Sequence, residues 1–368
     1  MSEDASPGVD TDETIEHTRR TPMERAIDDW LLSLESGNYR SNAERTVREF
    51  RRFAEREHGV TTPADVDDDL CREYARDLRR DDNLAASSAH RYYAHIRSFL
   101  AWCVRDGRAD TNPAERNRAS EPLPQDINDP DRQFWDADTR EAFLAHMDAH
   151  AHDALDEDSD HDRRAAFRDR ALVYVVALSG ARGAELFRVP ADDRRTGLSW
   201  ADVSLDRGVL SVLGKTREQQ SVQLPGPAVD VLERYRQVLD DPQPDDPVFR
   251  TWHASTLAQQ ANTYATEYDD PVAVLREHDP SLLGISVQAA RRVVKEHSEA
   301  AGLTGSDGDH LKLHGARRGL GDQLYGEQAE LAQEVLRHKS IETTHKAYRE
   351  QRASDRAEDV EDVLYGDE

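Results

Sequence analysis

The chain has 368 residues, of which 37% are hydrophobic, and its formal net charge at pH 7 is −26. This length exceeds what one compact core usually holds, so we expect two domains. The longest apolar run, residues 171–178, is too short to cross a membrane, and the polar residues 1–21 lack the pattern of a signal peptide, so we expect a cytoplasmic protein.

The charge is distributed unevenly, which is compatible with DNA binding despite the acidic total. Residues 290–349 contain ten basic and nine acidic side chains, whereas residues 148–162 contain seven acids and no Lys or Arg. Only five of the 48 basic residues are lysines. Because net charge governs solubility more than fold, this composition indicates a protein kept soluble in concentrated salt. On charge alone, an acidic protein with no nucleic-acid partner is the alternative.

Hydrophobic periodicity predicts an all-helical first domain over residues 22–116, after a tail, residues 1–21, that we expect to be disordered. The second helix of this domain should start at Ser41, whose hydroxyl would form a capping box with Glu44, and should stop before Gly59. The first helix carries apolar residues at helical spacing: Ile27, Trp30, Leu31 and Leu34.

Two further helices are predicted at about 67–80 and 87–105, the second beginning at Ser87 or Ser88. Both cysteines fall within these apolar-periodic segments, which favours small buried thiols over a disulfide or a metal site. They are Cys71 and Cys103.

A stripe of arginines on the second helix is a candidate DNA-binding surface, because spacings of three and four residues align side chains that could follow a DNA backbone. With Arg91, the candidates are Arg45, Arg48, Arg52 and Arg56. The alternative is an ordinary solvated face, since glutamates on the same helix offer salt partners. These are Glu44, Glu49, Glu55 and Glu57.

Residues 117–133, which contain three prolines, are predicted to link the first domain to a second one over residues 134–350. The second domain should open with a helix near 137–150, followed by an acidic loop. We interpret the histidines there as part of a solvated segment rather than a metal site, because their spacing is loose and no cysteine joins them. They are His146, His150 and His152.

Beyond this loop, the apolar run ends at Ser179-Gly180, and alternating residues in 203–224 predict a β-hairpin with its turn at 214–216. The rest is predicted to be helical to about 350, with an insert of uncertain structure at 241–285, before an acidic tail, residues 351–368.

Four short segments contain the groups that a side chain needs to cleave a phosphodiester. Negative charge builds up on the non-bridging oxygens when phosphorus is attacked, and two arginine forks can bind such oxygens bidentately. Arg182 and Arg317 are the candidates. Each residue alone is weak evidence, since isolated arginines and histidines are usually surface ion pairs or helix caps.

The other candidates supply the nucleophile and the proton transfers. Tyr348 is the predicted nucleophile, and a tyrosine with its usual pKa of about 10 needs a neighbouring base or positive field to react. Lys215, on the hairpin turn, is a candidate general acid for the leaving oxygen, and His314 is a candidate base. His338 would donate a hydrogen bond to the phosphate. No metal or cofactor is required.

In this order, the segments resemble the boxes of the tyrosine recombinase, or phage integrase, family, which includes Xer-like resolvases. Residues 202–215 are similar to the strand pair that carries the family's active-site lysine, and residues 336–344 resemble its leucine-glycine-histidine box. Residues 22–113 are similar to its core-binding domain. The resemblance implies a mainly α protein of the DNA breaking-rejoining fold, in which a helical SAM-like domain precedes an α+β catalytic domain with a small antiparallel sheet.

The resemblance also implies a mechanism and partners. Tyr348 would form a 3′-phosphotyrosine, a 5′ hydroxyl would leave, and the hydroxyl of a second strand would reverse the step without ATP. The expected partners are double-stranded DNA at specific recombination sites, a homo-tetramer on paired sites and accessory DNA-bending proteins. Together with the composition, the resemblance points to a halophilic archaeon, or its virus or plasmid, as the source.

Three features depart from the family's pattern. Arg337 replaces the common glycine before His338, Arg318 stands where a histidine or lysine often follows the second arginine, and an insert lies near 191–197. Two rival functions stay open: a catalytically silent, recombinase-derived DNA-binding regulator, and a metal-dependent nuclease that uses the His- and Asp-rich loop.

Overall fold

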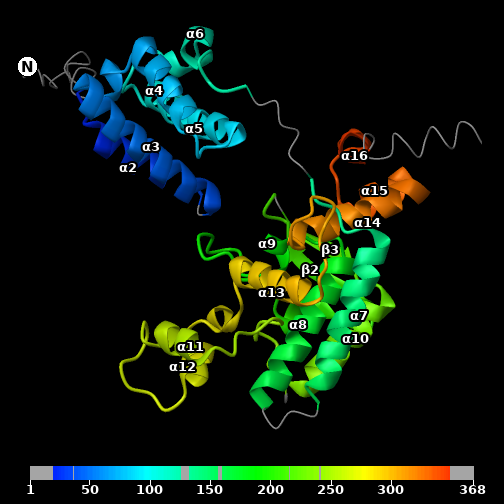
Figure 1. Cartoon of the computed structure of the whole chain (residues 1–368). Helices are drawn as coiled ribbons and strands as arrows, with labels where there is room; N and C mark the ends of the chain where they lie inside the picture. The colour runs from blue at the N-terminus through cyan, green and yellow to red at the C-terminus, as the bar shows by residue number, and fades with distance from the viewer. Residues whose placement is uncertain are drawn as a thin grey trace, which may run out of the picture. The chain divides into compact units, whose positions relative to one another are not determined.

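The structure is a computed structural model of the chain, and it describes residues 20–35, 37–125, 132–155, 160–214, 216–239 and 242–348. Two compact units are formed, Met1–Asp129 and Pro130–Glu368 (Figure 1). The described residues are mainly helical, with one three-stranded antiparallel sheet, so the predicted fold class is confirmed. The predictions for Lys215 and for nearly all of both acidic tails lie outside the described residues.

The first unit is helical, as the periodicity predicts. Its elements are α2 (Met23–Leu32), α3 (Asn38–His58), η1 (Pro63–Asp65), α4 (Asp68–Arg80), α5 (Ala86–Arg105), η2 (Pro113–Glu115) and α6 (Asn117–Ser120). The carboxylate of Asp67 caps α4 by accepting a hydrogen bond from the Leu70 backbone N–H at 2.8 Å. Gly59 ends α3 in the left-handed conformation, φ 67°, that glycine adopts at little cost.

Two predicted helix starts are wrong. The backbone turns into α3 at Gly37, so Ser41 and Glu44 already lie inside the helix and form no capping box. The Glu44 carboxylate instead accepts a hydrogen bond from Arg48 at 3.0 Å. Similarly, α5 begins at Ala86, without a side-chain cap, one residue before the predicted serine.

The core of the first unit is formed by large apolar side chains from four helices. Trp30 of α2 and Phe99 of α5 are buried, with ring centroids 5.4 Å apart. Both cysteines are buried and free, and burial raises the pKa of each thiol to about 12, so the prediction of buried thiols is confirmed. Ala119 and Leu123, from the stretch predicted as a linker, also pack into this core.

The second unit surrounds one buried helix, α8. Its elements are α7 (Ala137–Asp153), α8 (Asp160–Leu178), α9 (Gly183–Leu186), η3 (Trp200–Asp202), β1 (Val203–Ser204), β2 (Val209–Leu213), β3 (Gln219–Gln223), α10 (Gly226–Val238), α11 (Ala254–Ala261), α12 (Pro271–His278), η4 (Pro280–Leu283), α13 (Val287–Ala300), α14 (Leu313–Glu327), α15 (Ala329–Leu336) and α16 (Ile341–Tyr348). Residues 171–177 of α8 are all buried, because α7, α10, α13 and α14 pack around it (Figure 1). This explains its continuous apolar run.

The sheet confirms the predicted hairpin. β2 pairs with β1 and β3, and the register of the second pair runs from Val209 opposite Gln223 to Leu213 opposite Gln219. The insert at 241–285 contains α11, α12 and η4, which bury a small apolar cluster of their own. Among the described residues, no helix is both long enough and apolar enough to cross a membrane.

Candidate active site

A cleft of about 420 Å³ in the second unit brings five of the six candidate catalytic residues together. Its lining residues come from the start of the unit, the α8–α9 junction, α14 and the C-terminal helices. They are Arg132, Phe134, Arg182, His314, Arg317, Arg318, His338, Thr343, Ala347 and Tyr348. The sixth candidate, Lys215, lies outside the described residues.

Arg182 is held at the N-terminus of α9 by a buried carboxylate. Gly180, at φ 65°, ends α8 in a conformation that favours glycine and directs the chain into this short helix. Glu185 accepts hydrogen bonds from the Arg182 backbone N–H at 2.8 Å and from its Nη1 at 2.9 Å. Arg337, at φ 53°, donates to the same carboxylate at 2.5 Å. The Arg337 side chain, which departs from the family's pattern, therefore supports the group that orients Arg182.

The Glu185 carboxylate is charged despite its burial. Burial acts to raise its pKa, but the hydrogen bond from the Arg182 backbone and the charge of Arg337 outweigh burial and lower the pKa. A buried carboxylate with two guanidinium partners holds both in fixed geometry.

Arg317 lies on α14 and is 3% exposed. Its two terminal nitrogens donate to the backbone carbonyls of Gly180 and Leu336, so it joins the end of α8 to the end of α15. A guanidinium has five N–H groups, which leaves donors for a ligand in the cleft. Burial, followed by the charge of Arg182, lowers the pKa of Arg317 to about 10.

Both histidines are neutral at pH 7. Removal of water around the ring, followed by the charges of Arg318, Arg317 and Arg182, lowers the pKa of His314 to about 4, although this residue is still exposed to solvent. For His338, burial and the same two arginines at 317 and 182 lower the pKa to about 4. The His338 Nδ1 lies 2.9 Å from the Thr344 hydroxyl, which fixes the ring and leaves Nε2 for another hydrogen bond.

Tyr348 ends α16 and is 3% exposed. Its ring centroid lies 5.8 Å from that of Tyr325, 6.4 Å from Phe134 and 6.5 Å from His338. The hydroxyl approaches the backbone of α14 at Gly321, where a Cβ atom would overlap it. Burial raises the pKa of the phenol to about 12, and the charge of Arg317 opposes this rise. Tyr348 is therefore protonated and needs a base to react.

The turn that precedes Lys215 is fixed to the Arg182 segment by Arg195. The Arg195 Nη1 donates to the carbonyls of Leu213, at 3.0 Å, and of Ala184 in α9, at 2.9 Å. Its Nη2 donates to the Gly214 carbonyl at 2.9 Å. The insert at 191–197 thus supplies a brace between the two segments that carry candidate catalytic residues.

Comparison with known proteins shows the family. The profile of the phage integrase family matches residues 147–355, which is more than half of the chain, and the profile of the phage integrase SAM-like domain matches residues 23–119. The chain belongs to the phage integrase family. The range matched by the phage integrase profile contains every lining residue of the cleft except Arg132 and Phe134.

Relatives within the integrase family include tyrosine recombinases. The chain is 31% identical over 193 residues to "Tyrosine recombinase XerC" of Pelobacter propionicus, covering 52% of this chain and 55% of the relative. It is 27% identical over 264 residues to "Tyrosine recombinase XerC" of Xylella fastidiosa, covering 71% and 69%. The chain thus spans about half to two thirds of the length of these curated relatives.

Solved integrase structures share the fold. A lambda integrase dimer bound to a COC′ core site has a TM-score of 0.56 at 15% identity, covering 89% of this chain and 95% of that one. The XerH site-specific recombinase bound to difH has a TM-score of 0.51 at 16% identity, covering 87% and 78%.

The arginine stripe of this integrase-family chain has mixed surroundings. Arg48 forms ion pairs with Glu24, Asp28 and Glu44, as a solvated face would. Arg56 likewise pairs with Glu57 at 2.6 Å. Arg45 instead donates to the Tyr92 hydroxyl at 2.7 Å, and Arg52 and Arg91 are exposed. A role of the stripe in DNA binding stays a prediction.

Sequence reasoning missed two positive residues of the cleft. Arg132 falls in the proline-containing stretch that predicts a linker, where no periodicity indicates a buried position, and Arg318 stood out only as a departure from the family's pattern. The predicted acidic loop begins later than expected: α7 extends to Asp153, so all three histidines lie on this helix, where the His150 ring is 4.7 Å from that of His297. In the described part of the chain, no three His, Cys, Asp or Glu side chains gather as a metal site.

Proposed function

We propose that this chain is a site-specific DNA recombinase that cleaves and rejoins DNA strands through a 3′-phosphotyrosine on Tyr348. The observation that carries the proposal is that one cleft brings Arg182 and Arg317 together with two histidines and this tyrosine. Membership of the phage integrase family supports it. The relatives named tyrosine recombinases support the same reaction class.

The roles follow from the charges of the groups. Arg182 and Arg317 would bind the non-bridging oxygens of the scissile phosphate and stabilise the charge that develops in the transition state. As the bond from the Tyr348 oxygen to phosphorus forms, the bond to the 5′ oxygen breaks, and Lys215 would donate the proton that this oxygen needs. The phosphodiester is exchanged for a phosphotyrosine ester, so rejoining requires neither ATP nor a metal ion.

Without DNA, the pKa values of the cleft residues are unfavourable for proton transfer from Tyr348. The pKa of the phenol is raised to about 12, whereas the pKa of His314 is lowered to about 4, so this base is weak in the empty cleft. A phosphate would neutralise part of the arginine charge that lowers the pKa of His314 and would strengthen it as a base. Binding of DNA would thus activate the reaction.

The wider assignments belong to the same proposal. Residues 22–116 would act as the core-binding domain and 134–350 as the catalytic domain, joined by 117–133. The partners would be double-stranded DNA, three further copies of the chain on paired sites, and accessory DNA-bending proteins. The acidic, lysine-poor composition supports a protein of the cytoplasm of a halophilic archaeon, or one encoded by its virus or plasmid.

The proposal is tested by single-turnover cleavage of a nicked duplex that carries a site selected from a random-sequence library by the full chain. Covalent protein–DNA complex should form in EDTA and without ATP. Arg182→Ala should slow its formation by on the order of 10² to 10³, the usual effect of removing one preorganised charge. Arg234, which is exposed on α10 and outside the cleft, is the control for substitution by alanine. Dependence on a divalent cation, or an unchanged rate for Arg182→Ala, would contradict the proposal.

A further inference from the structure

The cleft contains more positive charge than a single scissile phosphate needs. Besides Arg182 and Arg317, it is lined by Arg132 and Arg318. Arg318 follows Arg317 on α14, and Arg132 lies at the start of the second unit. The mechanism proposed above gives neither of them a role.

Neither additional guanidinium has an acidic partner within the described ranges. The hydrogen bonds and ion pairs of residues 132–155, 160–214, 216–239 and 242–348 include none from the side chains of Arg132 or Arg318. Burial, followed by the charge of Arg132, lowers the pKa of Arg318, so the two cations lie close enough to repel each other. An anion placed between them would remove this repulsion.

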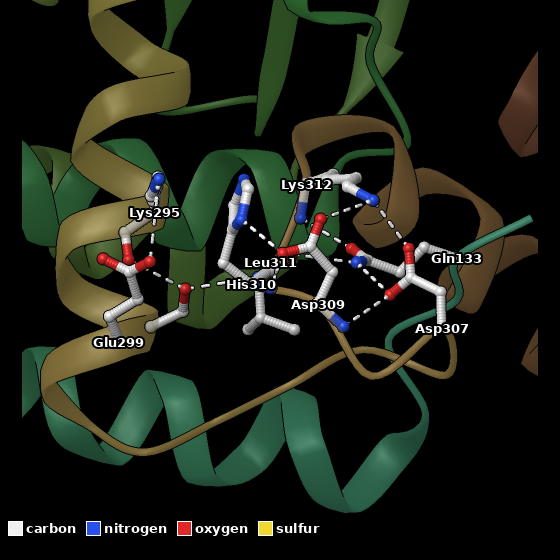
Figure 2. A network of polar contacts seen from close by, with 9 residues as sticks. Gln133, Lys295, Glu299, Asp307, Asp309, His310, Leu311 and Lys312 are labelled. Carbon is white, nitrogen blue, oxygen red and sulfur yellow. Dashed lines mark hydrogen bonds and ion pairs between the residues drawn. The ribbon is translucent and has the colours of Figure 1, made fainter. Parts of the chain in front are cut away.

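Arg132 is anchored by a polar network next to it in the sequence (Figure 2). Gln133 is 2% exposed, and its Nε2 donates to the Asp307 carboxylate at 2.7 Å and to the His310 carbonyl at 2.9 Å. Its Oε1 accepts a hydrogen bond from the Lys312 backbone N–H at 2.6 Å, directly before α14. The network therefore fixes the residue after Arg132 to the base of the helix that carries Arg318.

The network contains its own charged pair, which keeps it in place. The Lys312 ammonium lies 2.6 Å from the Asp307 carboxylate. Burial acts to raise the pKa of Asp307, but the hydrogen bonds from Lys312 and Gln133 outweigh it and lower the pKa to about 2. The backbone of Phe134 is also fixed, because its N–H donates to the Ser306 hydroxyl at 2.9 Å. Arg132 thus enters the cleft from an ordered segment.

We propose that Arg132 and Arg318 together bind a second DNA phosphate, next to the one that Tyr348 attacks. Two guanidinium groups can clamp the oxygens of one phosphate, and they bind phosphate more specifically than lysine does. The second phosphate fixes the direction in which the strand crosses the cleft. This inference rests on the proposed function, because it assigns the anion to the DNA strand that is cleaved.

The test is the salt dependence of binding of a labelled duplex of about 30 base pairs, measured by fluorescence anisotropy for the full chain. Each neutralised phosphate contributes about −0.9 to the slope of log K against log salt concentration. Arg132→Ala and Arg318→Ala should each make the slope less steep by about 0.9 and weaken binding to all sequences alike. The slope of the double variant should differ little from that of either single variant, since both residues contact one phosphate. Circular dichroism at each KCl concentration ensures that only folded protein is compared.

Arg234→Ala is the matched control and should leave the slope unchanged. Slopes for Arg132→Ala and Arg318→Ala equal to that of the control would overturn the inference. If the slope of the double variant changed by twice as much as that of either single variant, the two arginines would contact different phosphates, which would overturn the proposal that they share one. Failure of the proposed function is recognised separately, because it abolishes covalent complex formation by the unmodified chain whatever the slopes are. Inorganic phosphate should compete with the duplex more weakly for Arg132→Ala than for the unmodified chain, and equal competition would count against the site.

Discussion

Replacement of Arg195 by alanine tests whether the insert at 191–197 serves the reaction. The side chain is 13% exposed and donates to three backbone carbonyls, of Ala184, Leu213 and Gly214, at 2.9–3.0 Å. A hydrogen bond from a charged donor contributes about 1.5–3 kcal/mol, and three from one side chain are not additive. We therefore expect Arg195→Ala to lower the free energy of unfolding of the second unit by about 2–4 kcal/mol, measured by urea denaturation.

The effect on catalysis should be larger than the effect on binding. Without the brace, the turn before Lys215 loses its attachment to α9, and misplacement of a catalytic group by about 1 Å can reduce a rate by about 10²-fold. Single-turnover cleavage by Arg195→Ala should fall by that order, while the Kd for DNA should stay within about threefold, because no phosphate contact is removed. Arg207→Ala is the control, since Arg207 is exposed and its Nε donates to the Ser204 hydroxyl at 2.8 Å, away from the turn.

Two results would refute this reasoning. If Arg195 acts through Lys215, the double variant Arg195→Ala/Lys215→Ala should be no slower than Lys215→Ala, and a multiplicative loss would show that it does not. A substrate with sulfur as the leaving atom needs no general acid, because a thiol has a pKa of about 8.5. Such a substrate should restore the rate of Arg195→Ala, and a failure to do so would place the defect elsewhere.

Two further predictions concern the other side of the cleft. The folded-state pKa of both His314 and His338 is about 4, below the ordinary value of about 6.5, so their contribution to stability is present above pH 6.5 and is lost as the pH falls through 4. The unfolding temperature should fall over this range, and less steeply for His338→Gln; parallel curves would contradict the assignment. Gly321→Ala should destabilise the protein by about 1–3 kcal/mol and reduce covalent trapping, because its Cβ would overlap the Tyr348 hydroxyl. Gly226→Ala, with no atom within 4 Å of the added Cβ, should do neither, and equal effects would refute the steric argument.

The types of the helices and strands were predictable because each has a strong local signal. The structure has a helix, α8, at the unbroken apolar run that ends before a glycine. It has the strands β2 and β3 where apolar residues alternate in the sequence. Helix starts were less predictable, because backbone geometry can replace a side-chain cap. Gly37 provides such a start for α3, four residues before the serine that the capping pattern favours. The insert at 241–285 gave no clear signal, since its helices are short and share a small core.

Prediction of the candidate site required more than the spacing of its residues. Arg182 and Arg317 lie far apart in the sequence, and only their order, matched to a family, indicated that they share one cleft. The conformation of Arg337 was open to question from the sequence, and the structure answers it: the left-handed backbone directs the side chain to Glu185. Arg132 could not be found, because its position depends on a polar network formed with residues about 175 positions later in the chain, such as Asp307 and His310.

The most direct test of the account is the identity of the residue that becomes linked to DNA. On a nicked duplex, the unmodified chain and Tyr325→Phe, whose ring lies 5.8 Å from that of Tyr348, should both form a covalent complex. Mass spectrometry should assign the nucleotide adduct to the peptide that contains Tyr348. Tyr348→Phe should bind the duplex with unchanged affinity and form no complex, whereas a covalent complex formed by Tyr348→Phe would contradict the central claim.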